Sequence, residues 1–87
     1  MNDFIRAGIE EANKRITPVY PDIWWTLDVN YQEGEPAFLL GHSPEAEAFV
    51  SLSIYKDDPY QEDGIQLQFF DFEENEWVSR EHPTEVV

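Results

Sequence analysis

Near the N-terminus, apolar side chains recur at the spacing of an α-helix. They are Ile5, Ile9, Ala12 and Ile16, which are separated by four, three and four residues. This spacing places them on one face of a helix, and Asn2 or Asp3 can cap its first turn. Residues 17–22 contain two prolines, each of which disfavours helix in the residue before it. The pattern predicts an amphipathic helix over residues 3–16.

Beyond residue 22 the apolar positions alternate with a period of two, which is the period of a β-strand. The alternation is clearest in residues 23–32, where every second side chain is Ile23, Trp25, Leu27, Val29 or Tyr31. Further strands are predicted at residues 37–42, 48–55, 65–72 and 77–82. Short connections between strands favour antiparallel neighbours. The sequence predicts an α+β fold in which one N-terminal amphipathic helix packs on a four- to five-stranded antiparallel meander sheet.

The same alternation predicts which side chains form the core. We expect the core to contain Ile5, Ile9, Ile16, Trp25, Leu27, Val29, Val50, Leu52, Ile54, Ile65, Leu67 and Phe69. A chain of 87 residues has enough interior for one core, so residues 1–87 are expected to form a single domain. The other sheet face is expected to carry small polar residues together with Trp24, Phe49, Tyr55 and Phe70. A solvated face rarely needs so many rings.

Composition adds a strong negative charge to this picture. The chain has 19 acidic and five basic residues, for a net charge of −14. Acids and bases cancel within residues 1–16, so the whole excess lies in residues 17–87. Solubility of a small domain needs a net charge of only about 2 to 8, and a larger one repels itself. Nucleic acid and anionic membranes are therefore unfavourable partners, and basic proteins are favourable ones.

The cysteine content and the lengths of the apolar segments indicate in which cellular compartment the protein is expected. The chain has no cysteine, which makes a reducing cytoplasm the default expectation. No signal-peptide pattern is present, and no apolar run approaches the ~20 residues of a membrane span.

No pattern of catalytic or metal-binding residues stands out. His42 and His82 lie at the ends of different predicted strands, and glycine-rich phosphate loops and nucleophile motifs are missing from the sequence. The acidic segment before Gly64 departs from a calcium loop at the first ligand, where Pro59 stands. Asp28 is expected to be a solvated residue within a strand. We therefore expect no catalytic residues, no metal and no cofactor, and a protein that is not an enzyme.

The candidate site combines acids with rings. In a meander, the connections at 33–36 and 57–64 fall at one end of the sheet, and those at 43–47 and 73–76 at the other. The candidate partner-binding acids are Glu33, Glu35, Asp57, Asp58, Glu62, Asp63, Asp71, Glu73, Glu74 and Glu76, and the candidate rings are Trp24, Tyr55 and Trp77. Gathered like charges are costly unless something positive meets them, and aromatic residues supply the anchors typical of interfaces.

These features favour a protein that binds and blocks a basic surface of another protein, such as a nucleic-acid-binding site. A DNA-mimic inhibitor fits, for example a phage-encoded anti-defence protein of the anti-CRISPR or anti-restriction type. The alternatives are an immunity protein or antitoxin that neutralises a basic nuclease toxin, and a non-enzymatic adaptor or assembly protein. In each case the expected partner is a basic protein, with no direct contact to nucleic acid or membrane.

Overall fold

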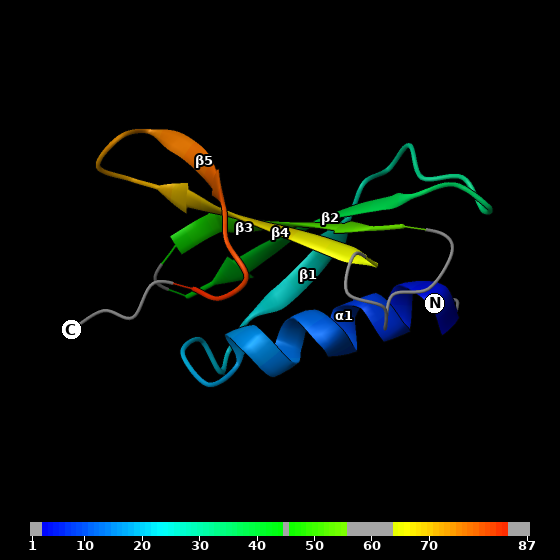
Figure 1. Cartoon of the computed structure of the whole chain (residues 1–87), viewed down its shortest axis with the longest axis horizontal. Helices are drawn as coiled ribbons and strands as arrows, with labels where there is room; N and C mark the ends of the chain where they lie inside the picture. Colours follow the sequence, from blue (N-terminus) through cyan, green and yellow to red (C-terminus); the bar gives the residue numbers. More distant parts are fainter. Residues whose placement is uncertain (1–2, 45, 56–63, 84–87) are drawn as a thin grey trace.

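The computed structural model describes residues 3–44, 46–55 and 64–83, apart from the side chains of residues 46–48. Within this part of the chain there are one helix and five strands (Figure 1). In order they are α1 (Asp3–Ile16), β1 (Trp24–Leu27), β2 (Ala37–Ser43), β3 (Ala46–Ile54), β4 (Ile65–Asp71) and β5 (Glu76–Ser79). Each strand pairs antiparallel with the next, in the sheet order β1-β2-β3-β4-β5. The predicted α+β fold, a helix packed on an antiparallel meander, is confirmed.

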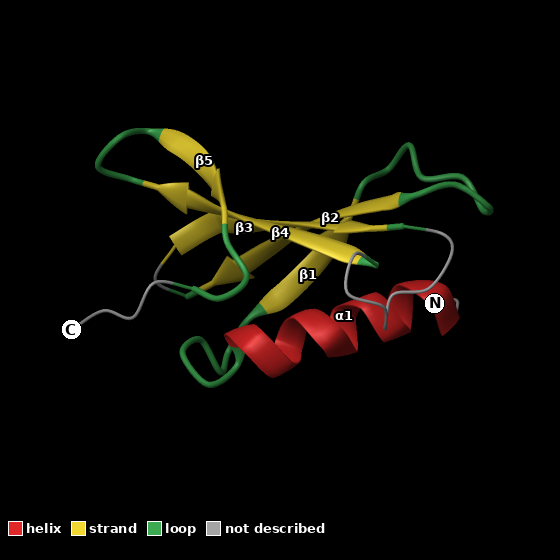
Figure 2. Cartoon of the chain, in the orientation of Figure 1, coloured by secondary structure: helices red, strands yellow, loops and turns green. Residues whose placement is uncertain are grey.

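The sheet has one covered and one uncovered face. Figure 2 shows α1 running along a single side of the sheet. We call the side against α1 the inner face, and the opposite side the open face. Strand residues on the inner face include Leu39, Val50, Leu52, Ile54, Ile65, Leu67 and Phe69, all of which are buried. The core is therefore a single layer between α1 and the sheet.

The sequence determines both ends of α1. Asp3 lies in the first turn and Lys14 and Arg15 lie in the last, where their charges complement the helix dipole. At the C-terminal end, the Thr17 hydroxyl donates a hydrogen bond to the Asn13 carbonyl at 2.6 Å. The Trp25 indole nitrogen also donates to the side chain of Asn13 at 3.0 Å, which ties β1 to α1. The helix has the predicted bounds.

Most of the predicted core is buried as expected. The confirmed core residues are Ile5, Ile16, Val50, Leu52, Ile54, Ile65, Leu67 and Phe69. Ile9 and Trp25 are partly buried and pack against this cluster. Ala12, Ala37 and Leu39 belong to it as well. The second strand therefore contributes to the core through Ala37 and Leu39, which the sequence analysis left out.

The prediction for residues 23–32 was wrong beyond Leu27. Val29 is 95% exposed and Leu27 is 39% exposed, so neither belongs to the core. Asp28 accepts a hydrogen bond from the Asn30 backbone N–H at 2.9 Å, and its own carbonyl accepts one from Tyr31 at 3.1 Å. These bonds make a turn that ends the strand, because Asp side chains readily bond to the backbone two residues on. The alternation of apolar residues continues past the point where the chain leaves the sheet.

The prediction for Phe49 was also wrong. Phe49 was expected on the polar face, but it is only 5% exposed and belongs to the core cluster. Its ring lies 4.5 Å from the ring of Tyr20, measured between centroids. The pairing of β2 with β3 shifts register between Gly41 and Ser43, and such an irregularity re-aims side chains. A period-two pattern cannot show a local shift of this kind.

Close packing of α1 on the sheet depends on Gly8. A Cβ atom at this position would overlap the side chain of Ile54, which is fully buried on β3. Gly8 therefore lets the helix backbone approach the sheet more closely than any other residue would allow.

We expect Gly8→Ala to destabilise the fold. In an exposed helix this change would gain about 1 kcal/mol of helix propensity. Here overpacking against Ile54 should cost about 1–3 kcal/mol and outweigh that gain, which leaves a net loss of up to about 2 kcal/mol in the free energy of unfolding. Urea unfolding followed by tryptophan fluorescence measures the change. Glu10→Ala, at an exposed position of the same helix, is the control and should stay within about 0.5 kcal/mol. A stabilised Gly8→Ala protein would contradict this packing.

Candidate interaction surface

The open face of the sheet carries no acidic or basic strand residue among those described, although the chain has a net charge of −14. Register and alternation place on it Trp24, Thr26, Phe38, Leu40, His42, Ser51, Ser53, Gln66, Gln68, Phe70, Trp77 and Ser79. Tyr55 extends the same face just past β3. The described strand residues of this face therefore contribute no carboxylate, and Asp28 borders the face just past β1. The excess charge lies elsewhere on the molecule.

Rings gather at both lateral edges of the open face. Across β1 and β2, Trp24 stacks on His42 with ring centroids 5.5 Å apart. Across β4 and β5, Trp77 meets Phe70 edge to face at 5.3 Å. Trp24 is 50% exposed and Trp77 is 40% exposed, so both rings are held in place and still accessible. Large, fixed and accessible aromatic side chains are typical of binding anchors.

Hydroxyl and amide groups occupy the middle of the open face. The Tyr55 hydroxyl donates to Gln66 Oε1 at 3.0 Å, and Gln66 Nε2 reaches the Ser79 hydroxyl at 3.4 Å. Near the other edge, the Thr26 hydroxyl lies 2.9 Å from His42 Nε2. The first two bonds join Tyr55, just past β3, to β4 and β4 to β5, and the third joins β1 to β2, so these side chains are held before any partner arrives. A surface fixed in advance loses less conformational entropy on binding.

The connection between β4 and β5 shows what the acids in residues 70–77 do. The Asp71 carboxylate accepts hydrogen bonds from the backbone N–H groups of Glu73 and Glu74, at 3.0 and 3.2 Å. Asn75 has a φ of 59°, a left-handed conformation that asparagine tolerates better than most residues. Asp71 therefore shapes the turn, and Glu73 and Glu74 project from it exposed.

One acidic pair in this hairpin opposes folding. Asp71 lies directly across from Glu76 in the β4–β5 register. Like charges in directly opposed positions of an antiparallel pair are destabilising. The chain thus keeps a repulsive pair beside the exposed rings of the hairpin.

The structure brings some of the predicted site residues together and separates others. Trp24, Tyr55 and Trp77 all lie on the open face and are 39–50% exposed. Glu33 and Glu35 are exposed in the β1–β2 connection, at the opposite end of the sheet from the β4–β5 turn (Figure 1). The predicted residues Asp57, Asp58, Glu62 and Asp63 lie outside the described residues.

Two residues of the open face were missed in the sequence. Phe38 is 51% exposed and Leu40 is 40% exposed, and both project between Trp24 and the polar centre of the sheet. They line a depression of about 440 Å³ that also includes Thr26 and Ser51. Strand β2 is apolar at nearly every position, so the sequence does not show which of its residues face outward. The only available signal was the small size of Ala37 and Gly41, which suits the crowded inner side.

The described residues were also searched for metal sites and membrane spans. Within them, no group of three or more His, Asp or Glu side chains is arranged to hold a metal ion. The one helix in this part of the chain is too short and too polar to cross a membrane.

Comparison with known proteins gives no match. No protein-family model, no curated protein and no solved structure is significantly similar to this chain. Arguments about function therefore rest on the surface itself.

We expect Glu76→Gln to stabilise the protein, because it removes the repulsion between Asp71 and Glu76. The gain in the free energy of unfolding should be about 0.2–1 kcal/mol, and it should shrink at high salt. Urea unfolding at low and high ionic strength measures both effects. Glu74→Gln is the matched control, since it removes the same charge from the turn without a directly opposed partner. Equal gains in the two variants would show that the opposed pair is unimportant.

Proposed function

We propose that this chain is a non-enzymatic binding protein that attaches to a basic, nucleic-acid-binding surface of another protein and blocks it. The kind of protein that fits best is a DNA-mimic inhibitor such as a phage-encoded anti-defence protein. The observation that carries the proposal is the open face, whose described strand residues include accessible rings and no acid, on a chain with a net charge of −14.

The layout of this surface matches the anatomy of protein interfaces. The fully buried centre of an interface is depleted in charged residues and enriched in aromatic ones, and its rim is polar. Here the open face supplies Trp24, Phe38, Tyr55 and Trp77 around a centre of serine and glutamine. Acidic turns lie at both ends of the sheet. A partner seated on this face would bury the rings and meet the carboxylates at the edges.

The charge supports a basic partner over other kinds. Summed negative charge accelerates encounter with a positive surface and repels nucleic acid and anionic lipid. Duplex DNA carries one charge about every 1.7 Å along its axis, and proteins that bind it present clustered lysine and arginine. An acidic domain with closely spaced carboxylates can compete for those side chains. Blocking a DNA-binding surface follows from this competition without any catalytic step.

Capture followed by competition tests the proposal. The tagged protein is used to capture partners from cells that contain it, and mass spectrometry identifies them. We expect a basic nucleic-acid-binding protein that loses its duplex when an equimolar amount of this chain is added. The proposal fails if the captured partner is not basic, if partner and DNA bind together, or if this chain alone shifts random duplex at physiological salt. A captured nuclease toxin would identify the inhibitor as an immunity protein.

Within such a complex we expect rings and acids to affect different rates. Trp24→Ala or Trp77→Ala should speed dissociation by about tenfold or more, because each removes an anchor. Changing Glu73 and Glu74 together to Gln should mainly slow association, by about two- to tenfold at low salt, because steering depends on the summed field. Surface plasmon resonance at several salt concentrations separates the two rates.

The control for these variants is Glu10→Ala, an exposed change on α1, on the covered side of the sheet. It should leave dissociation unchanged. If the tryptophan variants dissociate at the wild-type rate while remaining folded, the open face is not the interface.

A further inference from the structure

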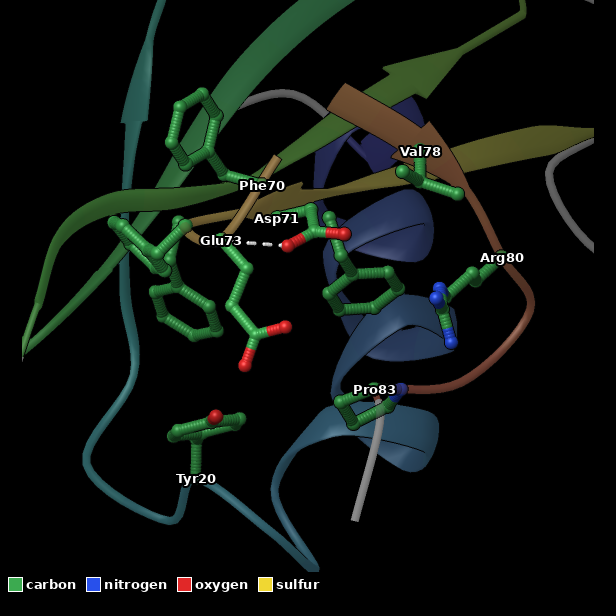
Figure 3. Close-up of a pocket in the computed structure, with 10 residues that line it drawn as sticks. Tyr20, Phe70, Asp71, Glu73, Val78, Arg80 and Pro83 are labelled. Carbon is green, nitrogen blue, oxygen red and sulfur yellow. Dashed lines mark hydrogen bonds between the residues drawn. The ribbon is translucent and has the colours of Figure 1, made fainter. Parts of the chain in front are cut away.

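A groove of about 460 Å³ lies on the helix side of the β4–β5 hairpin, past the C-terminal end of α1 (Figure 3). It faces mainly the inner side, where its strand residues Phe69 and Val78 point, although Phe70 of the open face also borders it. α1 ends at Ile16, and the chain that follows it contributes Tyr20 to the wall of the groove. The helix therefore covers the inner face only in part and leaves this end accessible.

The floor of the groove is aromatic. Phe49 and Phe69 are 5% and 8% exposed, and Tyr20 packs against Phe49. Pro83 is buried and closes one side. The register shift in the β2–β3 pairing is what turns Phe49 inward, so the same irregularity that alters the sheet also builds this floor.

The rim of the groove is charged. Figure 3 shows the Glu73 carboxylate extending over the groove toward Tyr20, while Arg80 stands on the opposite side, beside Val78 and Pro83. Asp71 lies between them, with one carboxylate oxygen bonded to the backbone N–H groups of the turn. Two acids and one base give the rim a net negative charge.

An arginine side chain suits both parts of this groove. Its methylene stem can pack along rings, and its planar guanidinium can stack on an aromatic face while it donates to a carboxylate. We infer that the groove receives one arginine side chain of the basic partner, stacked on the aromatic floor and hydrogen-bonded to Glu73. The inference rests on the proposed function for the source of the arginine. A partner bound in this way would contact the β4–β5 hairpin both on the open face and in the groove.

The inference predicts opposite effects on binding when the charge of Glu73 and the charge of Arg80 are removed. A guanidinium in the groove is attracted by Glu73 and repelled by Arg80. Removing the acid should weaken binding, and removing the base should strengthen it. A site for an anion or for a neutral apolar group would not respond in this way.

Two capped tripeptides test the inference without the partner, namely glycine-arginine-glycine and the same peptide with neutral citrulline in place of arginine. NMR titration of the full chain should show saturable shifts at Val78 and Tyr20, with a Kd on the order of 1 mM for the arginine peptide. The citrulline peptide should bind at least about fivefold more weakly, because it lacks the charge-assisted hydrogen bond. Glu73→Gln should weaken the arginine peptide about three- to fivefold, and Arg80→Gln should strengthen it by a similar factor.

Glu10→Gln is the matched control, because it removes the same charge from an exposed position of α1 outside the groove and should leave the Kd within about twofold. Equal binding of the two peptides, shifts confined to the open face, or changes of the same sign for Glu73→Gln and Arg80→Gln would each overturn the inference. The proposed function is judged separately. If the tryptophan variants lose a basic partner while the arginine peptide leaves the groove unchanged, the groove inference is wrong and the proposed function stands.

Discussion

One helix must cover a five-stranded sheet, and this constraint shapes the rest of the molecule. α1 has 14 residues and lies close to the sheet because Gly8 presents no side chain to Ile54. A single helix buries one face of the sheet and leaves the other to solvent. The open face and the groove past the end of α1 are both parts of the sheet that the helix does not reach. The accessible aromatic surface is therefore a consequence of the architecture and not of a few unusual side chains.

The division between charged and uncharged surface follows the same layout. Most of the described carboxylates stand in the turns and on α1, whereas the described strand positions of the open face carry hydroxyl, amide, aromatic or aliphatic side chains. Placing acids in turns lets each one stay hydrated and limits the cost of self-repulsion. Asp71 and Glu76 depart from this layout, since they oppose one another across two strands. This repulsive pair lies beside the rings of Phe70, Phe72 and Trp77 and lowers the stability of the hairpin.

Sequence periodicity predicted the helix, the strand order and most of the core, because burial on one face imposes a regular spacing. It failed where local hydrogen bonds or irregular pairing overruled that spacing. Asp28 ends β1 through its own turn, and this left Val29 exposed despite its place in the alternation. A register shift turned Phe49 inward, and an almost wholly apolar β2 concealed Phe38 and Leu40. For the candidate site, the sequence singled out the rings Trp24, Tyr55 and Trp77, which the structure places on the open face, but only strand pairing shows that the described strand positions of this face carry no acid.

The lengths of the strands also bear on whether the edges of this sheet can pair with further strands. The two edge strands, β1 and β5, have four residues each, whereas the three inner strands have seven, nine and seven. Long, flat edges invite further strands from other molecules, and short edges offer few unpaired backbone groups to a newcomer. The turn at Asp28 truncates one edge, and Glu76 places a charge on the other. The open face can therefore stay exposed while the short edge strands disfavour the edge-to-edge pairing that builds fibrils.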